Sequence, residues 1–298
     1  MIKKRKTERF TGSMVAIVTP FYQGKVDRKT LEKLVEFQVQ NNTSGIVPCG
    51  TTGESPTLDM EEHKMVNEIV IQKVRGRIPV IAGTGSNNTR EAIELTHHAK
   101  QSGADAVLLV APYYNRPTQA GLYEHFKVIS KAVNIPGIIY NIPSRTGVNI
   151  EPDTMAKIAD LKNVIGIKEA SGNLDQMSRI IAACPEDFIL LSGDDCLTLP
   201  VLSIGGKGVI SVAANIVPKD ISEMIDAFSK QDIEKARRLH YRLLPLLKVL
   251  FIETNPVPVK TAMVLMGLIK EGIRLPLTRM SEQNFAKLKE TLHKYGLI

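Results

Sequence analysis

"VIGIKEAS", residues 164–171, is a continuous apolar run that ends in a lysine, an acid and two small residues. Unbroken Val and Ile residues, rather than apolar residues that alternate with polar ones, predict a strand covered on both faces. Lys168 stands where this apolar run ends. Because a lysine is rarely buried without a partner, we expect Lys168 to be either a solvated strand end or a reactive amine.

Seven further apolar runs share this character. They are "MVAIVTP" (14–20), "GIVPCG" (45–50), "PVIAGTG" (79–85), "AVLLVAP" (106–112), "PGIIYNIP" (136–143), "FILLSGDD" (188–195) and "GVISVAAN" (208–215). Polar or amphipathic stretches such as "RKTLEKLVEFQVQNN" and "TREAIELTHHAKQSG" separate them, as in consecutive βα units. Eight such units predict an α/β protein with a (β/α)₈ barrel. An open doubly wound sheet is the alternative, but "GTGSNN" (83–88) lacks the third glycine of its fingerprint.

The pattern changes after Asn215, where no further strand is indicated. Helices are predicted over 218–230, 233–251, 257–270 and 281–295. We therefore expect a barrel over residues 1–217 and a C-terminal helical region, 218–298, packed on it.

Composition excludes several classes of function. The formal charge is +7, but 5 of the 38 basic residues precede position 10 and Trp is absent, so an anionic small substrate accounts for the charge better than nucleic acid does. No apolar segment has the length of a membrane span. The start, "MIKKRKTERF", lacks the apolar stretch of a secretion signal, so we expect a solvated tail and a cytoplasmic protein. The three widely spaced cysteines indicate reduced thiols rather than disulfides or a zinc site.

Polar groups follow several of the predicted strands. "GTTGES" (50–55) offers amides and hydroxyls to an anion, although a turn leading into a helix cap would have the same composition. Tyrosines follow strands four and five, and Arg145 and Lys168 stand at the ends of strands five and six. Because catalytic groups of a barrel gather at the carboxyl ends of its strands, we expect these side chains to share one rim.

Tyr140 stands one βα unit before Lys168, so the two side chains are expected to meet over the barrel mouth. Gly166, two residues before Lys168, is expected to leave the lysine space. Burial would lower the pKa of the amine, which could then form a Schiff base with a carbonyl, while the phenol transfers protons. The alternative is an ordinary surface lysine.

Three other groups of polar residues bear on the function of this rim. Arg145 could hold a substrate carboxylate, or could be solvated. Asp194 and Asp195 are expected to cap and hydrogen-bond rather than to bind a metal, because no histidine shares a motif with them. His97 and His98 are expected on a helix away from the rim.

Together these residues resemble the dihydrodipicolinate synthase and N-acetylneuraminate lyase superfamily, and most closely its dihydrodipicolinate synthase branch. The resemblance covers nearly the whole chain and rests on "GTTGES", "PYYNRP", "YNIPSRTG", "IKEASG", "LSGDD", "GGKGVISVAAN" and "NPVPVK". It implies a class I aldolase without a cofactor that condenses pyruvate with L-aspartate 4-semialdehyde in the diaminopimelate route to lysine. It also implies a homotetramer, a dimer of dimers.

The resemblance assigns roles residue by residue. Lys168 would form the Schiff base. Tyr140, Thr51 and Tyr114 would form a proton relay, with Tyr114 reaching in from a neighbouring subunit. Arg145 would bind the aldehyde's carboxylate and Thr52 the pyruvate carboxylate, while the backbones of Gly193 and Ile210 would line the pocket.

Many members of this family are inhibited by lysine. The matching positions are Ser55, His63, Asn87, Glu91 and Tyr113, whereas Met60 stands where lysine-sensitive relatives often carry a histidine. Two other functions stay open at this point. One is a sibling pyruvate aldolase, such as N-acetylneuraminate lyase or a 2-keto-3-deoxy sugar acid aldolase. The other is a non-catalytic barrel that binds an anionic metabolite.

Overall fold

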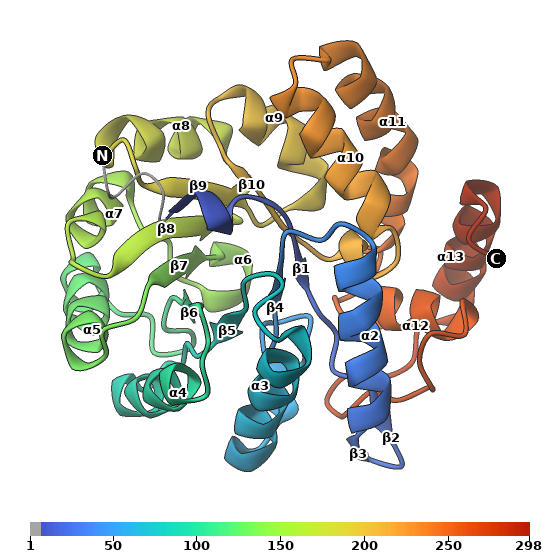
Figure 1. The fold of residues 1–298 in the computed structure, drawn as a ribbon, viewed down its shortest axis with the longest axis horizontal. Coiled ribbons are helices and arrows are strands. Elements are labelled where there is room, and N and C mark those ends of the chain that lie inside the picture. Colours follow the sequence, from blue (N-terminus) through green and yellow to red (C-terminus); the bar gives the residue numbers. More distant parts are fainter. Residues whose placement is uncertain (1–6) are drawn as a thin grey trace.

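Eight parallel strands form the centre of the molecule (Figure 1). The structure is a computed structural model that describes residues 7–298. The barrel strands are β1 (Gly12–Ala16), β4 (Gly45–Val47), β5 (Ile81–Gly83), β6 (Ala106–Val110), β7 (Gly137–Asn141), β8 (Val164–Glu169), β9 (Ile189–Ser192) and β10 (Gly208–Ser211). Seven of them lie within the predicted runs, and β1 begins two residues before its run at Met14, so the predicted strands are confirmed.

The sheet closes on itself. Its strand order is β4-β1-β10-β9-β8-β7-β6-β5, so β4 and β5 stand at its two ends. A parallel bridge between Ile46 and Val80 joins these ends. The backbone N–H of Gly83 also donates to the carbonyl of Pro48 at 3.0 Å. Closure confirms the predicted barrel and brings all the carboxyl ends of the strands to one rim.

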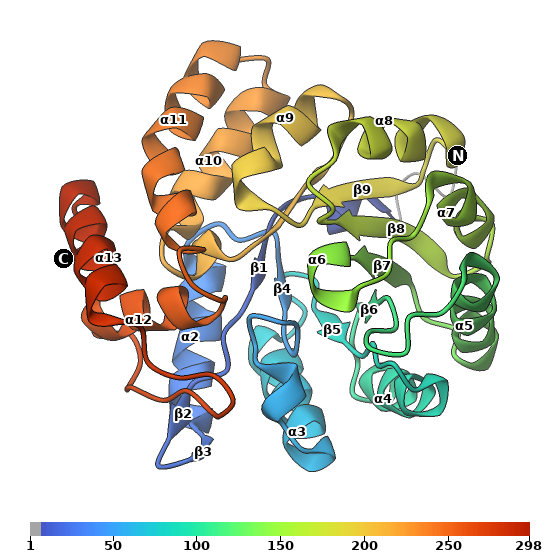
Figure 2. The same cartoon turned by 180° about the vertical axis from the view of Figure 1, so that it is seen from behind.

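Helices cover the outside of the barrel, as both ribbon views show (Figures 1 and 2). They are α2 (Arg28–Gln40), α3 (Met60–Val74), α4 (Thr89–Gln101), α5 (Gln119–Ala132), α7 (Pro152–Ala159), α8 (Leu174–Ala183), α9 (Thr198–Ser203) and α10 (Pro218–Ser229). Side-chain oxygens of Asp27, Asp59, Asn88, Thr118 and Asn173 accept backbone N–H groups at the starts of five of these helices. Such caps fix where each helix begins and therefore how long each βα loop is.

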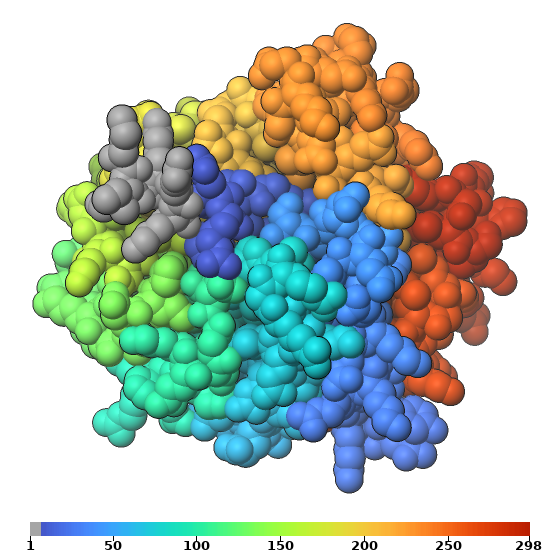
Figure 3. Space-filling view, viewed as in Figure 1, coloured from blue at the N-terminus to red at the C-terminus, as the bar shows by residue number. Residues whose placement is uncertain are grey.

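Apolar side chains fill the barrel interior, and the start of the chain takes part in this packing. Phe10, which is 2% exposed, packs in one cluster with Met14, Leu108 and Ile138. Residues Glu8–Phe10 form a 3₁₀ turn in which Glu8 and Arg9 are exposed and Phe10 is buried. The expectation of a solvated tail up to the first strand is therefore wrong for Phe10, whose ring packs on the barrel core. The rest of the expected tail, residues 1–6, lies outside the described residues. In Figure 3 the dark-blue start of the described chain lies over the middle of the face shown.

Four helices follow β10: α10, α11 (Ile233–Val249), α12 (Val257–Leu265) and α13 (Glu282–Tyr295). Ile221 and Met224 of α10 share a core cluster with Val15 of β1, so α10 completes the eighth βα unit. Leu243 of α11 and Leu288 of α13 belong to the same cluster, which joins the C-terminal helices to the barrel. The expected division at residue 217 stays a prediction.

Two local features differ from the predictions. α12 ends at Leu265 rather than at Lys270, because Gly267 adopts a left-handed conformation (φ +71°) and the N–H of Leu268 bonds back to Met263. A small hairpin, β2 (Phe21–Tyr22) and β3 (Lys25–Val26), was not predicted. Its turn places Gln23 and Gly24 at positive φ, which is the geometry of tight hairpin turns.

Within residues 7–298, no helix combines the length and the apolar character that crossing a membrane requires. Cys49, Cys184 and Cys196 are free thiols. Cys49 is buried, and burial raises the pKa of its thiol above the ordinary value.

Candidate active site

Lys168 and Tyr140 lie directly beside each other. They are register partners on the neighbouring strands β8 and β7, at the carboxyl ends of both. The Lys168 Nζ atom lies 4.3 Å from the centroid of the Tyr140 ring. The predicted meeting of amine and phenol ring is therefore confirmed, and its cause is the parallel register of two consecutive βα units.

The Lys168 amine is buried, with 6% of the residue exposed. Burial lowers the pKa of this amine from 10.5 to about 8, while the charge of Asp195 opposes the shift and that of Arg145 adds to it. At pH 7 a pKa of about 8 leaves about a tenth of the amine uncharged, compared with about 0.03% for an ordinary lysine. Lys168 is therefore not a solvated strand end, and near neutral pH it has the uncharged amine that a nucleophile needs.

The glycine that gives Lys168 its space is Gly193 and not Gly166. A Cβ atom on Gly193 would lie 3.2 Å from Lys168 Cε and 2.6 Å from the Ala170 Cβ. A Cβ on Gly166 would instead meet Ile189 Cγ1 at 2.3 Å. The expectation for Gly166 is wrong because its missing side chain is filled by the neighbouring strand β9.

Tyr140 is held in its protonated form. Burial raises the pKa of its phenol from 10.0 to about 12, although an interaction with the hydroxyl of Thr51 partly offsets the shift. Thr51 lies in the turn after β4, on the far side of the barrel mouth from β7. The phenol therefore keeps its O–H, which can donate and accept a proton, and is not a resident phenolate.

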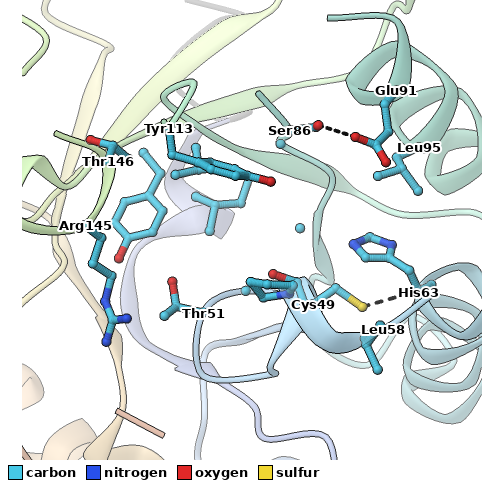
Figure 4. Close-up of a pocket in the computed structure, with 18 of the residues that line it drawn as sticks. Cys49, Thr51, Leu58, His63, Ser86, Glu91, Leu95, Tyr113, Arg145 and Thr146 are labelled. Carbon is cyan, nitrogen blue, oxygen red and sulfur yellow. Dashed lines mark hydrogen bonds between the residues drawn. The ribbon is translucent and has the colours of Figure 1, made fainter. Parts of the chain in front are cut away.

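A cavity of about 310 Å³ opens beside this pair. Thr51 and Arg145 lie at one end of it in Figure 4, and His63 and Glu91 lie at the other. Tyr140 also lines the cavity. Lys168 is not among the lining residues, but the Tyr140 ring that its amine contacts is. Residues predicted to follow the C-terminal ends of β4, β6 and β7 thus line the same cavity.

Thr52 and Arg145 are joined through the C-terminal region. The carboxamide Nδ2 of Asn255 donates to Thr52 Oγ1 at 3.0 Å, and the carbonyl oxygen of Asn255 accepts from Arg145 Nη2 at 3.0 Å. Asn255 lies in the "NPVPVK" run, whose side chains were not expected to contact either residue. Nothing in the sequence near Thr52 indicates this contact, because 203 residues separate the two.

The remaining predicted site residues lie in different surroundings. Ile210 is buried in the interior cluster that also contains Tyr140, and the N–H of Gly193 donates to the Glu169 carbonyl at 2.7 Å. Tyr114 is 91% exposed, has a left-handed backbone (φ +70°) and does not line the cavity. Within one chain the structure therefore does not bring Tyr114 to Tyr140 and Thr51.

Four of the five residues matched to a lysine site lie along this cavity. Ser55, His63, Glu91 and Tyr113 line it. Asn87 does not, but its Nδ2 donates to the Tyr113 carbonyl at 3.2 Å. Burial lowers the pKa of His63 to about 4, with a smaller effect from His98, so the ring is neutral at pH 7.

Asp194 and Asp195, which follow β9, make hydrogen bonds that stabilise the loops at the carboxyl ends of the strands. The carboxylate of Asp195 accepts hydrogen bonds from the Ser211 hydroxyl and from the backbone N–H groups of Val212 and Ala213, which fixes the end of β10. Asp194 accepts from the N–H of Cys196 at 2.8 Å. The expected capping and hydrogen-bonding roles are confirmed. The effect of the Asp195 charge on the pKa of Lys168 was not predicted, because it depends on the burial of both groups, which the sequence does not show.

A buried ion pair supports the "GTTGES" turn. Lys260 Nζ contacts Glu54 Oε1, and both side chains are almost fully buried. Nζ also donates to the Thr19 carbonyl at 3.0 Å. Glu54 has a left-handed backbone (φ +54°), so the turn is held in an uncommon conformation by this contact. In the sequence, the only indication of this ion pair was that two of the motifs, "GTTGES" and "NPVPVK", contain residues of opposite charge.

No cluster of three or more His, Cys, Asp or Glu side chains suited to a metal ion occurs within residues 7–298. His98 lies on α4, where its Nε2 contacts Glu68 Oε1 at 3.0 Å, which fits the expected place of this histidine on a helix.

Comparison with known proteins adds a second line of information. Residues 9–295 match the model of the Dihydrodipicolinate synthetase family. The chain is 58% identical over 289 residues to a 4-hydroxy-tetrahydrodipicolinate synthase of Syntrophus aciditrophicus (strain SB), covering 97% of this chain and 99% of the relative. It is also 58% identical, with the same coverage, to the enzyme of that name from Thermodesulfovibrio yellowstonii.

A solved structure is similar over the same extent. The crystal structure of dihydrodipicolinate synthase from Aquifex aeolicus superposes with a TM-score of 0.95 at 55% sequence identity. The match covers 97% of this chain and 99% of that one. Sequence and fold therefore point to the same group of proteins.

Proposed function

The chain belongs to the dihydrodipicolinate synthetase family, and from this premise we propose that it is a 4-hydroxy-tetrahydrodipicolinate synthase. It condenses pyruvate with L-aspartate 4-semialdehyde in the diaminopimelate route to lysine and is a lyase of the class I aldolase type. The observation that carries this function is the buried amine of Lys168 against the ring of Tyr140 at the strand ends.

Lys168 is the nucleophile. Its uncharged Nζ attacks the keto carbon of pyruvate, and loss of one water gives an imine. The protonated imine draws electrons from the adjacent methyl group, which loses a proton and becomes an enamine. The enamine carbon then forms a bond to the aldehyde carbon of the second substrate. The amine of that substrate displaces Lys168 from the imine carbon, so the product leaves as a ring and the lysine is regenerated.

Tyr140 transfers the protons that these steps require. Its high pKa keeps the phenol protonated, so it donates to the departing water and takes the proton back through Thr51. We assign Tyr114 of a neighbouring subunit as the third member of this relay. The exposure of Tyr114 in the single chain supports this role, since it is free to enter another subunit's site. A homotetramer, as a dimer of dimers, follows as part of the proposal.

Two groups hold the substrate carboxylates. Thr52 binds that of pyruvate through its hydroxyl, and Arg145 binds that of the aldehyde substrate through its guanidinium group. Arg145 lines the cavity, and its Nη2 bond to Asn255 leaves other N–H donors for a ligand. The backbones of Gly193 and Ile210 complete the walls around the imine. No metal or other cofactor takes part in these steps.

In this proposal the cavity also binds lysine as a feedback inhibitor, at the five residues matched to a lysine site. Ser55, His63, Asn87, Glu91 and Tyr113 supply hydroxyl, carboxylate and amide groups for an amino acid's charged ends. The test is turnover with added L-lysine, with Glu91→Gln as the variant expected to lose inhibition. Unchanged turnover in the wild type removes this part of the proposal, and Met60 is the residue at which the sequence already departs from sensitive relatives.

We also assign the protein to the cytoplasm, which fits its three free thiols. A sibling pyruvate aldolase would share Lys168 and Tyr140, but the identities of 58% are to relatives that carry the synthase name. Coupled assays with L-aspartate 4-semialdehyde and with sugar aldehydes separate the two functions.

Borohydride trapping tests the function. The protein is incubated with pyruvate, reduced, digested and analysed by mass spectrometry. We expect a pyruvate adduct on Lys168 and none on Lys168→Ala. Absence of the adduct in the wild type refutes the enzyme and favours a non-catalytic binding barrel.

A further inference from the structure

We propose that Asn255 is a positioning residue that directs the Thr52 hydroxyl toward the keto-acid carboxylate and thereby sets the affinity of the site for that substrate. Asn255 lies between α11 and α12, outside the eight βα units that supply the other site residues. The inference rests on the proposed function, because it assumes that Thr52 binds the pyruvate carboxylate.

The geometry fixes which way Thr52 donates. Asn255 is 5% exposed and Thr52 is 2% exposed, so neither side chain can hydrogen-bond to bulk water. The amide N–H group of Asn255 occupies an acceptor position on Thr52 Oγ1 at 3.0 Å. A hydroxyl that accepts in this way retains its single hydrogen for donation elsewhere. Since a carboxylate only accepts hydrogen bonds, Asn255 prepares Thr52 in the form that a carboxylate needs.

The amide is used at only one of its two ends. The Nδ2 atom has Thr52 as its partner, whereas Oδ1 is buried and has no protein partner within the described residues. Within the described residues, Thr52 is thus the hydrogen-bond partner of this side chain, so the carboxamide acts on the site through Thr52.

The same residue contacts the second carboxylate-binding group through a different atom. Its backbone carbonyl accepts from Arg145 Nη2 at 3.0 Å. Truncating the side chain removes the Thr52 contact and retains the Arg145 contact. The two substrates therefore respond differently to one substitution, which a general loosening of the site would not produce.

The test combines four proteins: the wild type, Asn255→Ala, Thr52→Val and the double variant. Imine formation is followed by cyanoborohydride trapping at a series of pyruvate concentrations. We expect Asn255→Ala to raise the half-saturating pyruvate concentration by about tenfold, because a hydrogen bond to a charged group is weakened. The maximal trapping rate and the KM for the aldehyde stay within about twofold.

The double variant distinguishes positioning from packing. If Asn255 acts through the Thr52 hydroxyl, Asn255→Ala has no further effect on pyruvate saturation once Thr52 is Val. Additive effects in the double variant overturn the inference, as does an unchanged half-saturation in Asn255→Ala. Asn255→Asp, which keeps the shape but offers only acceptors, is expected to weaken pyruvate binding as well; wild-type affinity in this variant also overturns it.

Failure of the inference is separable from failure of the proposed function. Thermal unfolding of each variant shows whether it is folded, and Asn255→Asp replaces Asn255→Ala if the latter is not. A wild-type protein that forms no pyruvate adduct refutes the function itself. A wild-type adduct with unchanged pyruvate saturation in the variants refutes only the role of Asn255.

Discussion

Adding one methyl group at Gly193 is predicted to slow imine formation without unfolding the barrel. In Gly193→Ala, the new Cβ would lie 2.6 Å from Ala170 Cβ, 3.2 Å from the Glu169 carbonyl oxygen and 3.2 Å from Lys168 Cε. Two of these neighbours are fixed to the backbone at the end of β8, so the flexible lysine side chain and the strand end must both move.

The expected size follows from these contacts. Overpacking of this kind costs about 1–3 kcal/mol, and misplacing a reacting group by about 1 Å lowers a rate by about a hundredfold. We therefore expect trapping of pyruvate on Lys168 to slow by at least about tenfold, while the melting temperature falls by only a few degrees for a chain of 298 residues.

The assay is cyanoborohydride trapping at saturating pyruvate, followed by intact-mass spectrometry. Gly137→Ala is the matched control, since a Cβ at this position on β7 would meet nothing closer than Leu109 Cδ1 at 3.6 Å. It is expected to trap at the wild-type rate. Wild-type trapping by Gly193→Ala would show that Lys168 does not need the space that Gly193 leaves, and would refute the packing argument.

Three further predictions follow from individual contacts. Tyr140→Phe is expected to lower turnover by at least about a hundredfold, because the proton carrier is lost, while pyruvate still forms the imine on Lys168, but more slowly. Lys260→Met leaves Glu54 charged in the core without its ammonium partner, so it is expected to cost about 3–5 kcal/mol of stability. Glu54→Leu is expected to restore part of this loss in the double variant. His125, whose pKa burial lowers to about 4, is neutral when folded, so lowering the pH from 7 to 5 is expected to destabilise the protein by about 2 kcal/mol through this residue.

Each of these has its own measurement. Steady-state turnover alongside trapping separates the two effects of Tyr140→Phe, and full turnover in the variant contradicts the relay. Denaturant titration measures the Lys260 series; a double variant no more stable than Lys260→Met contradicts the unpaired-charge argument. For His125, stability is measured at pH 7 and pH 5. The folded state resists protonation while the unfolded chain accepts it below about pH 6.5, so His125→Gln should lose less stability on acidification than the wild type does.

The barrel was predictable because its signal is local and repeated. Unbroken runs such as 106–112 and 136–143 each contain a strand of the closed sheet. The pairing of Lys168 with Tyr140 was predictable for the same reason, since consecutive βα units place their strand ends side by side. These features require only the order of the chain and the period of its apolar residues.

The features that were missed depend on contacts between distant segments. Asn255 and Thr52 are 203 residues apart, and Lys260 and Glu54 are 206 apart. Gly193 rather than Gly166 leaves room for Lys168, and this depends on which residues of the neighbouring strand lie against each glycine. Phe10 was assigned to a tail because its neighbours are charged, yet its ring covers the barrel core. Tertiary packing decides all four.

The central claim is that burial lowers the pKa of Lys168 enough to leave a substantial fraction of its amine uncharged near neutral pH. The most direct test is the initial rate of pyruvate trapping on Lys168, measured by mass spectrometry from pH 6 to pH 11 at low pyruvate concentration. The account predicts a rate that rises with a midpoint at about pH 8. A midpoint near 10.5, the ordinary value for lysine, would contradict it.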